Sequence, residues 1–278
     1  MELSFKIDLK NKVVVVTGGS GVICSELCRA LDECEATIAI LDLNYQKANE
    51  LAKSLKHAKA YECNVLDKDS LAGVHQQINK DFGDIDILIN GAGGNNPKAT
   101  TDKEYFEVGD LDKDIKTFFD LDKEGFNFVF DLNILGTLLP TQEFAKDMVN
   151  KKGCSILNIS SMNAFTPLTK IPAYSSAKSA VSNFTKWLAV HFSHVGIRVN
   201  AIAPGFFSTA QNKSLLWNMD GTPTARTHKI LDATPMGRFG EVSELVGATL
   251  FLLDEKAASF ITGVILPIDG GFSSYSGV

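Results

Sequence analysis

Short apolar runs alternate with longer segments of helical periodicity along most of this chain. Most of these runs are apolar at every position, which is typical of parallel strands that are buried on both faces. Residues 172–194 carry an apolar stripe at helical spacing, and several other connections are long enough for a crossover helix. The pattern predicts an α/β fold, with a doubly wound parallel sheet of about seven strands and helices on both faces. The expected strands are residues 13–17, 37–41, 60–63, 85–90, 155–160, 198–203 and 263–267.

No repeat, low-complexity segment or linker divides the chain, so we expect one domain over residues 1–278. Two connections are longer than usual. The first, residues 94–127, contains nine acidic residues and four lysines between Asp102 and Glu124. It is interpreted either as a solvated surface insertion or as a flap beside a substrate. The second, residues 206–234, is expected to form a substrate lid, because ligands of open α/β sheets bind at the carboxyl ends of the strands.

Composition excludes several classes of protein. A net charge of −6 argues against a nucleic-acid-binding surface, which requires clustered Lys and Arg. No apolar stretch approaches the roughly 20 residues of a membrane span, and the first residues contain no signal-peptide core. The five cysteines form no C-x-x-C pair, which favours a reduced protein over a disulfide framework or a zinc site. We therefore expect a cytoplasmic protein that binds neither a metal, a nucleic acid nor a membrane.

The first apolar run leads into a glycine cluster formed by Gly18, Gly19 and Gly21. A turn from a strand into a helix leaves free backbone N–H groups, and these favour a phosphate. Asp42 ends the next apolar run. A carboxylate at that position can accept hydrogen bonds from the ribose hydroxyls of an adenosine and would repel a 2′-phosphate. A simple turn at the glycines and a helix cap at Asp42 are the alternatives.

Tyr174 and Lys178 are four residues apart on the expected helix 172–194, so their side chains share one face. Ser161 lies at the end of the preceding strand. Reduction of a ketone needs an acid that protonates the developing alkoxide, and a nearby ammonium lowers the pKa of a tyrosine from its ordinary value of about 10. A serine hydroxyl can hold the substrate oxygen. Spacing alone also fits an incidental Tyr–Lys pair.

Several motifs, in the same order, resemble those of the short-chain dehydrogenase/reductase family along nearly the whole chain. TGGSG is similar to the family's T-G-x-x-x-G-x-G motif, and NGAG to its N-A-G motif. Asn133 in DLNILGT matches the helix asparagine, and Ser161 with YSSAK matches the catalytic S…Y-x-x-x-K. The dipeptide PG before Thr209 matches the segment that closes over the nicotinamide. The resemblance implies a Rossmann-type fold and an NAD(P)-dependent oxidoreductase.

The resemblance also implies a role for each matching residue. Tyr174 would be the general acid–base, Lys178 would bind the nicotinamide ribose and lower the pKa of Tyr174, and Ser161 would orient the carbonyl. Asn133 would support a water that relays protons to Lys178. Asp42 favours NAD(H) over NADP(H), and the family usually forms homotetramers or homodimers. The implied cofactor contacts are Thr17, Gly18, Gly19, Gly21, Val22, Asp42, Asn64, Val65, Asn90, Gly91, Ala92, Tyr174, Lys178, Pro204, Gly205 and Thr209.

Three positions depart from the family pattern. In an ungapped alignment Val22 and Cys24 stand where the first motif has its second and third glycines. A one-residue deletion would instead keep Gly21 as the central glycine and put Ile23 at the third. In either alignment the motif is incomplete, and we expect Gly21 to supply the flexible turn. Asn64, in CNVLD, stands where the family usually has aspartate in the segment beside the adenine. An amide can still donate and accept hydrogen bonds there. We therefore expect a variant but working cofactor loop.

The loops are most similar to those of the D-mannonate oxidoreductase group, which interconverts D-fructuronate and D-mannonate with NAD(H). This similarity includes GAGGNNPKATT, SSMNAFTPLTKIPAYS and GGFSSYSGV, and loops usually carry specificity. A sugar acid requires a cation and several amides, so Asn163, Asn95 and Lys98 are expected substrate contacts. A polar turn at residues 95–98 is the alternative. Rival partners for the carboxylate are Arg226, Lys213 and Arg238.

Two other functions stay open. One is another sugar-acid or polyol dehydrogenase of the same family, of the gluconate 5-dehydrogenase type. The other is a non-catalytic, NAD-binding regulator on the same scaffold, since a fold does not fix a function. The complete set of Ser161, Tyr174, Lys178 and Asn133 favours an enzyme, because a protein without turnover has no need of all four.

Overall fold

The computed structural model describes residues 7–209 and 216–277. Seven parallel strands form one sheet in the order β3-β2-β1-β4-β5-β6-β7. Every expected strand is present, with bounds that differ from the expected ones by at most two residues. The strands are β1 (Val13–Thr17), β2 (Thr37–Asp42), β3 (Ala58–Glu62), β4 (Ile87–Asn90), β5 (Cys154–Ile159), β6 (Ile197–Pro204) and β7 (Ile265–Ile268). The strand order reverses between β1 and β4, which creates a crevice at their carboxyl ends.

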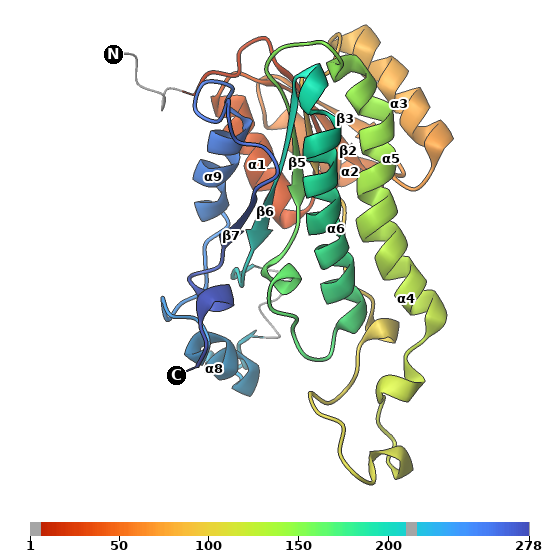
Figure 1. The fold of residues 1–278 in the computed structure, drawn as a ribbon, viewed down its shortest axis with the longest axis vertical. Coiled ribbons are helices and arrows are strands. Elements are labelled where there is room, and N and C mark those ends of the chain that lie inside the picture. The colour runs from red at the N-terminus through yellow and green to blue at the C-terminus, as the bar shows by residue number, and fades with distance from the viewer. Residues whose placement is uncertain (1–6, 210–215, 278) are drawn as a thin grey trace.

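Helices cover both faces of the sheet, as expected (Figure 1). Side chains of β1 alternate between the two cores: Val14 and Val16 pack with α1, α2 and α9, whereas Val13 and Val15 pack with α3, α5 and α6. The apolar strands are therefore explained by burial on both sides. The helices are α1 (Val22–Glu33), α2 (Tyr45–Lys53), α3 (Lys68–Asp81), α4 (Lys123–Phe130), α5 (Gly136–Phe144), α6 (Pro172–His191), α8 (Ala225–Asp232) and α9 (Glu244–Leu253). Among the described helices, none has the length and apolar character needed to cross a membrane.

The first long connection projects from the carboxyl end of the sheet between β4 and α4 (Figure 1). Its fold depends on a buried carboxylate, that of Asp110, which accepts hydrogen bonds from Lys103 at 2.9 Å and from Lys113 at 2.8 Å. These contacts hold the pKa of Asp110 well below its usual range. Two lysines of the acidic segment thus pair with its buried carboxylate, while most of its other residues are exposed.

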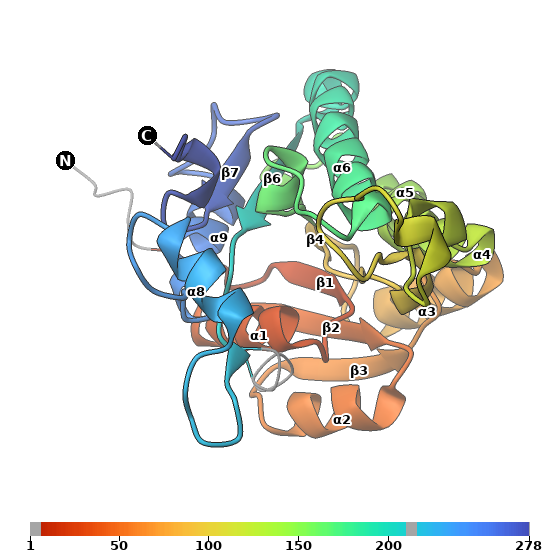
Figure 2. The same cartoon turned by 90° about the horizontal axis from the view of Figure 1, so that it is seen from below.

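The described part of the second long connection contains α8, which lies at the same end of the molecule as the first connection (Figures 1 and 2). An ion pair of 2.8 Å between Glu104 and Lys229 joins the two connections directly. Both long connections therefore lie where ligands of this architecture bind.

Candidate active site

The turn between β1 and α1 places its left-handed residue at Gly18, whose φ is +60°. Gly21 precedes α1 with a φ of −65°, which any residue can adopt, so the expectation that Gly21 supplies the flexible turn is wrong. A Cβ on Gly18 would also lie 2.9 Å from the Cα of Ala92. Backbone conformation and close approach of the β4 loop together require glycine at position 18.

Asp42 lies at the rim of this turn. One carboxylate oxygen accepts hydrogen bonds from the backbone N–H of Ser20 at 3.0 Å and from its hydroxyl at 2.7 Å, and the other accepts from the N–H of Asn44 at 2.9 Å. Asn44, not Asp42, caps α2, which removes the helix-cap alternative for Asp42. Beside the turn lies a cavity of about 640 Å³ whose lining includes Ser20, Val22 and Thr209.

Cys24, which stands in place of a motif glycine, packs beside Gly91. Its side chain is buried, and a Cβ on Gly91 would lie 2.1 Å from the Cys24 sulfur and 2.7 Å from the carbonyl oxygen of Thr17. The Thr17 hydroxyl accepts hydrogen bonds from Gly91 at 3.1 Å and from Ala92 at 3.3 Å, which joins β1 to the loop after β4. The larger residue at position 24 is therefore compatible with this loop because position 91 has no side chain.

We expect Gly91→Ala to destabilise the protein by about 1–3 kcal/mol, because the new methyl group overpacks against Cys24 and Thr17. The matched control is Gly73→Ala on α3, where a Cβ meets nothing within 4 Å. Urea unfolding of both variants tests this prediction. If Gly91→Ala is as stable as Gly73→Ala, the steric argument fails.

Of three expected cofactor contacts, Asn90 and Val65 turn their side chains into the protein, whereas Asn64 is exposed. The buried Asn90 amide donates to Thr141 and to the side-chain oxygen of Asn158, both at 2.9 Å, and so joins β4 to α5 and β5. The Asn64 oxygen accepts from the N–H of Leu66, and Val65 is buried against α5. The Asn90 and Val65 side chains therefore pack beneath the crevice rather than projecting into it.

The segment after β6 is fixed by close packing. A Cβ on Gly205 would lie 2.6 Å from the Cα of Asp269, so no side chain fits at the second position of the PG dipeptide. Pro204 ends β6, and Thr209 is half-buried beside the glycine turn. Thr209 therefore lines the same cavity as Ser20 and Val22 of the glycine turn.

The structure brings the expected Ser, Tyr and Lys residues together. Tyr174 and Lys178 lie on α6, and Ser161 lies two residues after β5 as the cap of a short 3-10 helix. Ser161 is hydrogen-bonded to Tyr174. The Lys178 ammonium is 5.7 Å from the centre of the Tyr174 ring and donates to the carbonyl of Ile159 at 2.8 Å. A hydroxyl, a phenol and an ammonium thus converge at the carboxyl end of β5.

Burial dominates the protonation of this cluster. It raises the pKa of Tyr174, and the hydrogen bond with Ser161 offsets only part of that rise. The pKa of Tyr174 is therefore raised, not lowered as expected from Lys178, and desolvation of the phenolate is the largest cause. Burial also lowers the pKa of Lys178 to about 8, against a smaller opposing effect of Cys24.

This lowered pKa predicts a stability that depends on pH. Below pH 8 Lys178 is protonated in both states, and its burial costs free energy. Between pH 8 and 10.5 the unfolded chain holds more protons than the folded one, so the contribution of Lys178 to stability rises with pH by at most about 3 kcal/mol. Lys178→Met should remove this rise. Urea unfolding of both proteins across this pH range measures it, and a difference in unfolding free energy that does not vary with pH would contradict it.

Asn133 lies in a π-helical segment, Asp131–Leu135, between α4 and α5. Its buried amide donates to the carbonyls of Gly94 at 2.8 Å and Val129 at 2.7 Å. A Cβ on Gly93 would lie 2.7 Å from the Asn133 side-chain oxygen and 3.1 Å from the Lys178 nitrogen. Asn133 and Lys178 therefore both border Gly93, and a π-helical widening of this kind is frequent at functional sites.

A cavity of about 410 Å³ opens between the first long connection, the loop before α6, and α8. Its charged lining residues are Glu104, Lys170, Arg226 and Lys229, so three cations face one carboxylate. Only Arg226 among these was expected from the sequence. The others come from three separate segments, and no sequence motif marks them. Its remaining lining residues are Thr100, Leu168, Thr169, Ile171, Phe206, Ala225, Ile230 and Phe272.

The three expected substrate contacts, Lys98, Asn95 and Asn163, lie in different environments. Lys98 is exposed and does not line this cavity, and Asn95 is also exposed and donates to Thr100 at 3.1 Å. Asn163 is buried two residues after Ser161, and its side-chain oxygen has no hydrogen-bond partner within the described residues. Lys213 lies outside the described residues. The expected carboxylate site at Lys98 is therefore not the cationic cavity of this structure.

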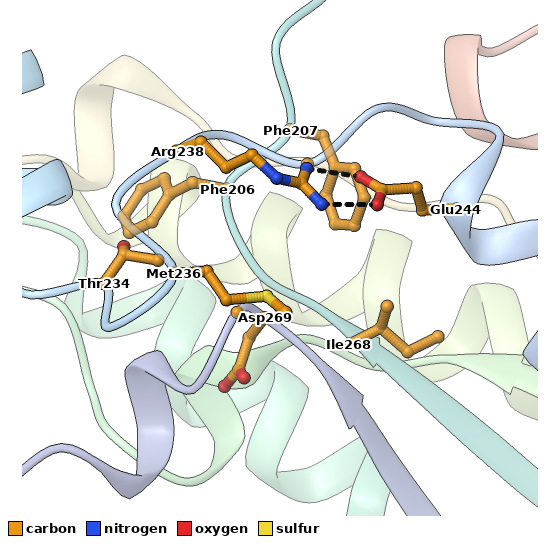
Figure 3. A pocket seen from close by; sticks show the side chains of 10 residues that line it. Phe206, Phe207, Thr234, Met236, Arg238, Glu244, Ile268 and Asp269 are labelled. Carbon is orange, nitrogen blue, oxygen red and sulfur yellow. Dashed lines mark hydrogen bonds and ion pairs between the residues drawn. The ribbon is translucent and has the colours of Figure 1, made fainter.

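Arg238 lines a different cavity, of about 240 Å³ (Figure 3). Both of its terminal nitrogens donate to Glu244, each at 2.7 Å. The pairing raises the pKa of Arg238 and lowers that of Glu244 to about 2. Because this bidentate pair already satisfies its guanidinium, Arg238 is a weaker candidate for the substrate carboxylate than Arg226.

A comparison with protein families matches residues 12–219 to the short chain dehydrogenases. The chain belongs to the short-chain dehydrogenase/reductase family. The match confirms the family resemblance that the motifs indicated.

Individual relatives extend this result. A Haemophilus influenzae protein, provisionally described as a D-mannonate oxidoreductase and solved with bound NAD, is 59% identical over the whole of both chains, with a TM-score of 0.95. The uncharacterized Bacillus subtilis oxidoreductase UxuB is 48% identical over 98% of each chain. A gluconate 5-dehydrogenase from Burkholderia cenocepacia, in complex with NADP and tartrate, is 27% identical over 98% of this chain and 99% of its own, with a TM-score of 0.81.

Proposed function

We propose that this protein is an NAD-dependent oxidoreductase that interconverts D-fructuronate and D-mannonate. The observation that carries the proposal is a cationic cavity built on the loop that joins Ser161 to the helix of Tyr174 and Lys178. A keto sugar acid needs both parts, a proton donor for the ketone and a positive surface for the carboxylate. The NAD-bound Haemophilus relative supports the same reaction class.

The residues at the glycine turn fit a dinucleotide. Gly18 and Gly91 leave no room for side chains, the start of α1 borders a cavity of about 640 Å³, and Asp42 lies at the rim of the turn. Asp42 would accept hydrogen bonds from ribose hydroxyls and repel a 2′-phosphate, which favours NAD(H). When bound, this cofactor supplies or accepts the hydride.

The chain's own residues would handle the proton. In the reductive direction Tyr174 donates its phenolic proton to the carbonyl oxygen as the carbon is reduced, and the Ser161 hydroxyl donates a hydrogen bond to the same oxygen. Lys178 carries a positive charge that favours the resulting phenolate. Asn133, which borders Gly93 together with Lys178, would hold the water that returns a proton to the site.

A gluconate 5-dehydrogenase activity is the second candidate, because the Burkholderia relative shares the fold over the full chain. Steady-state kinetics with NADH and a panel of D-fructuronate, 5-keto-D-gluconate and D-fructose separate the two. We expect the highest kcat/KM with D-fructuronate. A clear preference for 5-keto-D-gluconate would replace the proposal with the alternative, and NADH binding without turnover of any ketone would favour a regulator.

We also propose that the enzyme is a cytoplasmic homo-oligomer. The outer face of α6 exposes Trp187 and Val190, with exposed fractions of 55% and 76%, and the helical segment before it exposes Phe128 and Leu135. A contiguous exposed apolar patch often marks a protein–protein interface. Sizing in solution tests the assembly.

A further inference from the structure

We propose that Arg226 and Lys170 bind the carboxylate of the substrate, at the cavity between α8 and the loop before α6. The inference rests on the proposed function in one respect, that the substrate is a carboxylated keto sugar. It assigns the specificity for an anion to residues outside the catalytic cluster.

The three cations of the cavity lie near one carboxylate, that of Glu104. Glu104 accepts hydrogen bonds from Lys229 at 2.8 and 2.9 Å, and its pKa is lowered first by that contact and then by the nearby Lys170 and Arg226. All three cations are therefore close enough to act on the same carboxylate. Since Glu104 neutralises only one of them, the cavity keeps an excess of two positive charges.

Lys229 is already paired, whereas the other two cations are available. Within residues 7–209 and 216–277, neither Arg226 nor Lys170 forms an ion pair, although both line the cavity. Arg226 offers a planar fork of donors that matches a carboxylate. This division of roles leaves Lys229 to join α8 to the first long connection and leaves Arg226 and Lys170 to a ligand.

The backbone holds Lys170 at this position. Its φ of +71° is unusual for a residue other than glycine, and its carbonyl accepts a hydrogen bond from Thr101 at 2.9 Å. Ile171, the next residue, both lines the cavity and precedes the helix that carries Tyr174. The anion site and the proton donor thus belong to one continuous segment, in which Ile171 joins the cavity to the helix of Tyr174.

The test compares a charged substrate with an uncharged one. Arg226→Gln and Lys170→Gln should each raise the KM for D-fructuronate by about 10- to 100-fold, the range expected for a lost hydrogen bond to a charged group. The KM for D-fructose, in which a hydroxymethyl group replaces the carboxylate, should change less than about threefold. Lys186→Gln removes an exposed lysine of α6 outside the cavity and is the matched control. Arg226→Lys, which keeps the charge, should recover part of the loss.

Equal KM values for D-fructuronate in the Gln variants and the wild type would overturn the assignment, and so would equal increases for both sugars. If the wild type does not reduce D-fructuronate at all, the proposed function fails separately. Binding of D-mannonate to the enzyme saturated with NADH, a complex that cannot react, then decides the inference. Weaker binding by Arg226→Gln supports it, whereas no binding by the wild type, or unchanged binding by the variant, refutes it.

Discussion

Tyr174→Phe should lower kcat for NADH-dependent reduction of D-fructuronate by about 10³-fold, within the range usual for loss of a general acid. The variant removes only the hydroxyl, which is hydrogen-bonded to Ser161 and is the one phenol beside the Lys178 ammonium. Without it no group of similar position can protonate the developing alkoxide. Initial rates followed through NADH absorbance measure the loss.

The control for this prediction is Tyr61→Phe. Tyr61 is a buried residue of β3 whose hydroxyl donates to Asp81 at 2.8 Å, so its loss affects local stability but not the site. NADH binding, measured by fluorescence, should be nearly unchanged in Tyr174→Phe, because the phenol is not expected to carry the cofactor alone. A variant that keeps more than about a tenth of the wild-type kcat would refute the assigned role of Tyr174.

Asp42→Asn should lower the preference for NADH over NADPH by about 10- to 100-fold. The substitution removes a negative charge that repels the 2′-phosphate of NADPH, and such a repulsion costs a few kcal/mol in a partly buried site. The asparagine oxygen can still accept hydrogen bonds from Ser20 or Asn44, which should preserve the turn. The ratio of kcat/KM values for the two cofactors measures the effect. Asp69→Asn, an exposed acid in the first turn of α3, is the control. An unchanged ratio in Asp42→Asn would mean that another residue selects the cofactor.

The fold was predictable because its signals are local. Each strand is a continuously apolar run, and burial on both faces of a parallel sheet produces that pattern directly. The catalytic residues were predictable for a similar reason. Tyr174 and Lys178 share a helix face by their spacing, and Ser161 follows a strand whose neighbours in the sheet are implied by the fold.

The conformation of the glycine turn could not be predicted from the sequence of the turn alone. The left-handed residue is Gly18, and the requirement for glycine there comes partly from Ala92, in a loop about 70 residues away in the sequence. The role of Gly91 depends in the same way on the volume of Cys24. The spacing of the motif residues gives no information on the contact of Gly18 with Ala92 or of Gly91 with Cys24.

The cationic cavity also could not be predicted from the sequence. Glu104 and Lys229 are 125 residues apart and meet only because both long connections fold over the same end of the sheet. Lys98 was an attractive candidate because it follows β4 closely, but the short 3-10 helix at Pro97–Ala99 leaves it exposed outside the cavity. Long-range packing, rather than distance along the chain, decides which cation faces a ligand.

Transfer of deuterium tests the central claim most directly. Wild-type enzyme is incubated with D-fructuronate and NADH that carries deuterium at the reactive carbon of the nicotinamide, and the product is analysed by NMR and mass spectrometry. The account predicts D-mannonate with one deuterium on the carbon that had carried the ketone, and no such product from Tyr174→Phe on the same time scale. D-fructuronate recovered unchanged, or a labelled product other than D-mannonate, would contradict it.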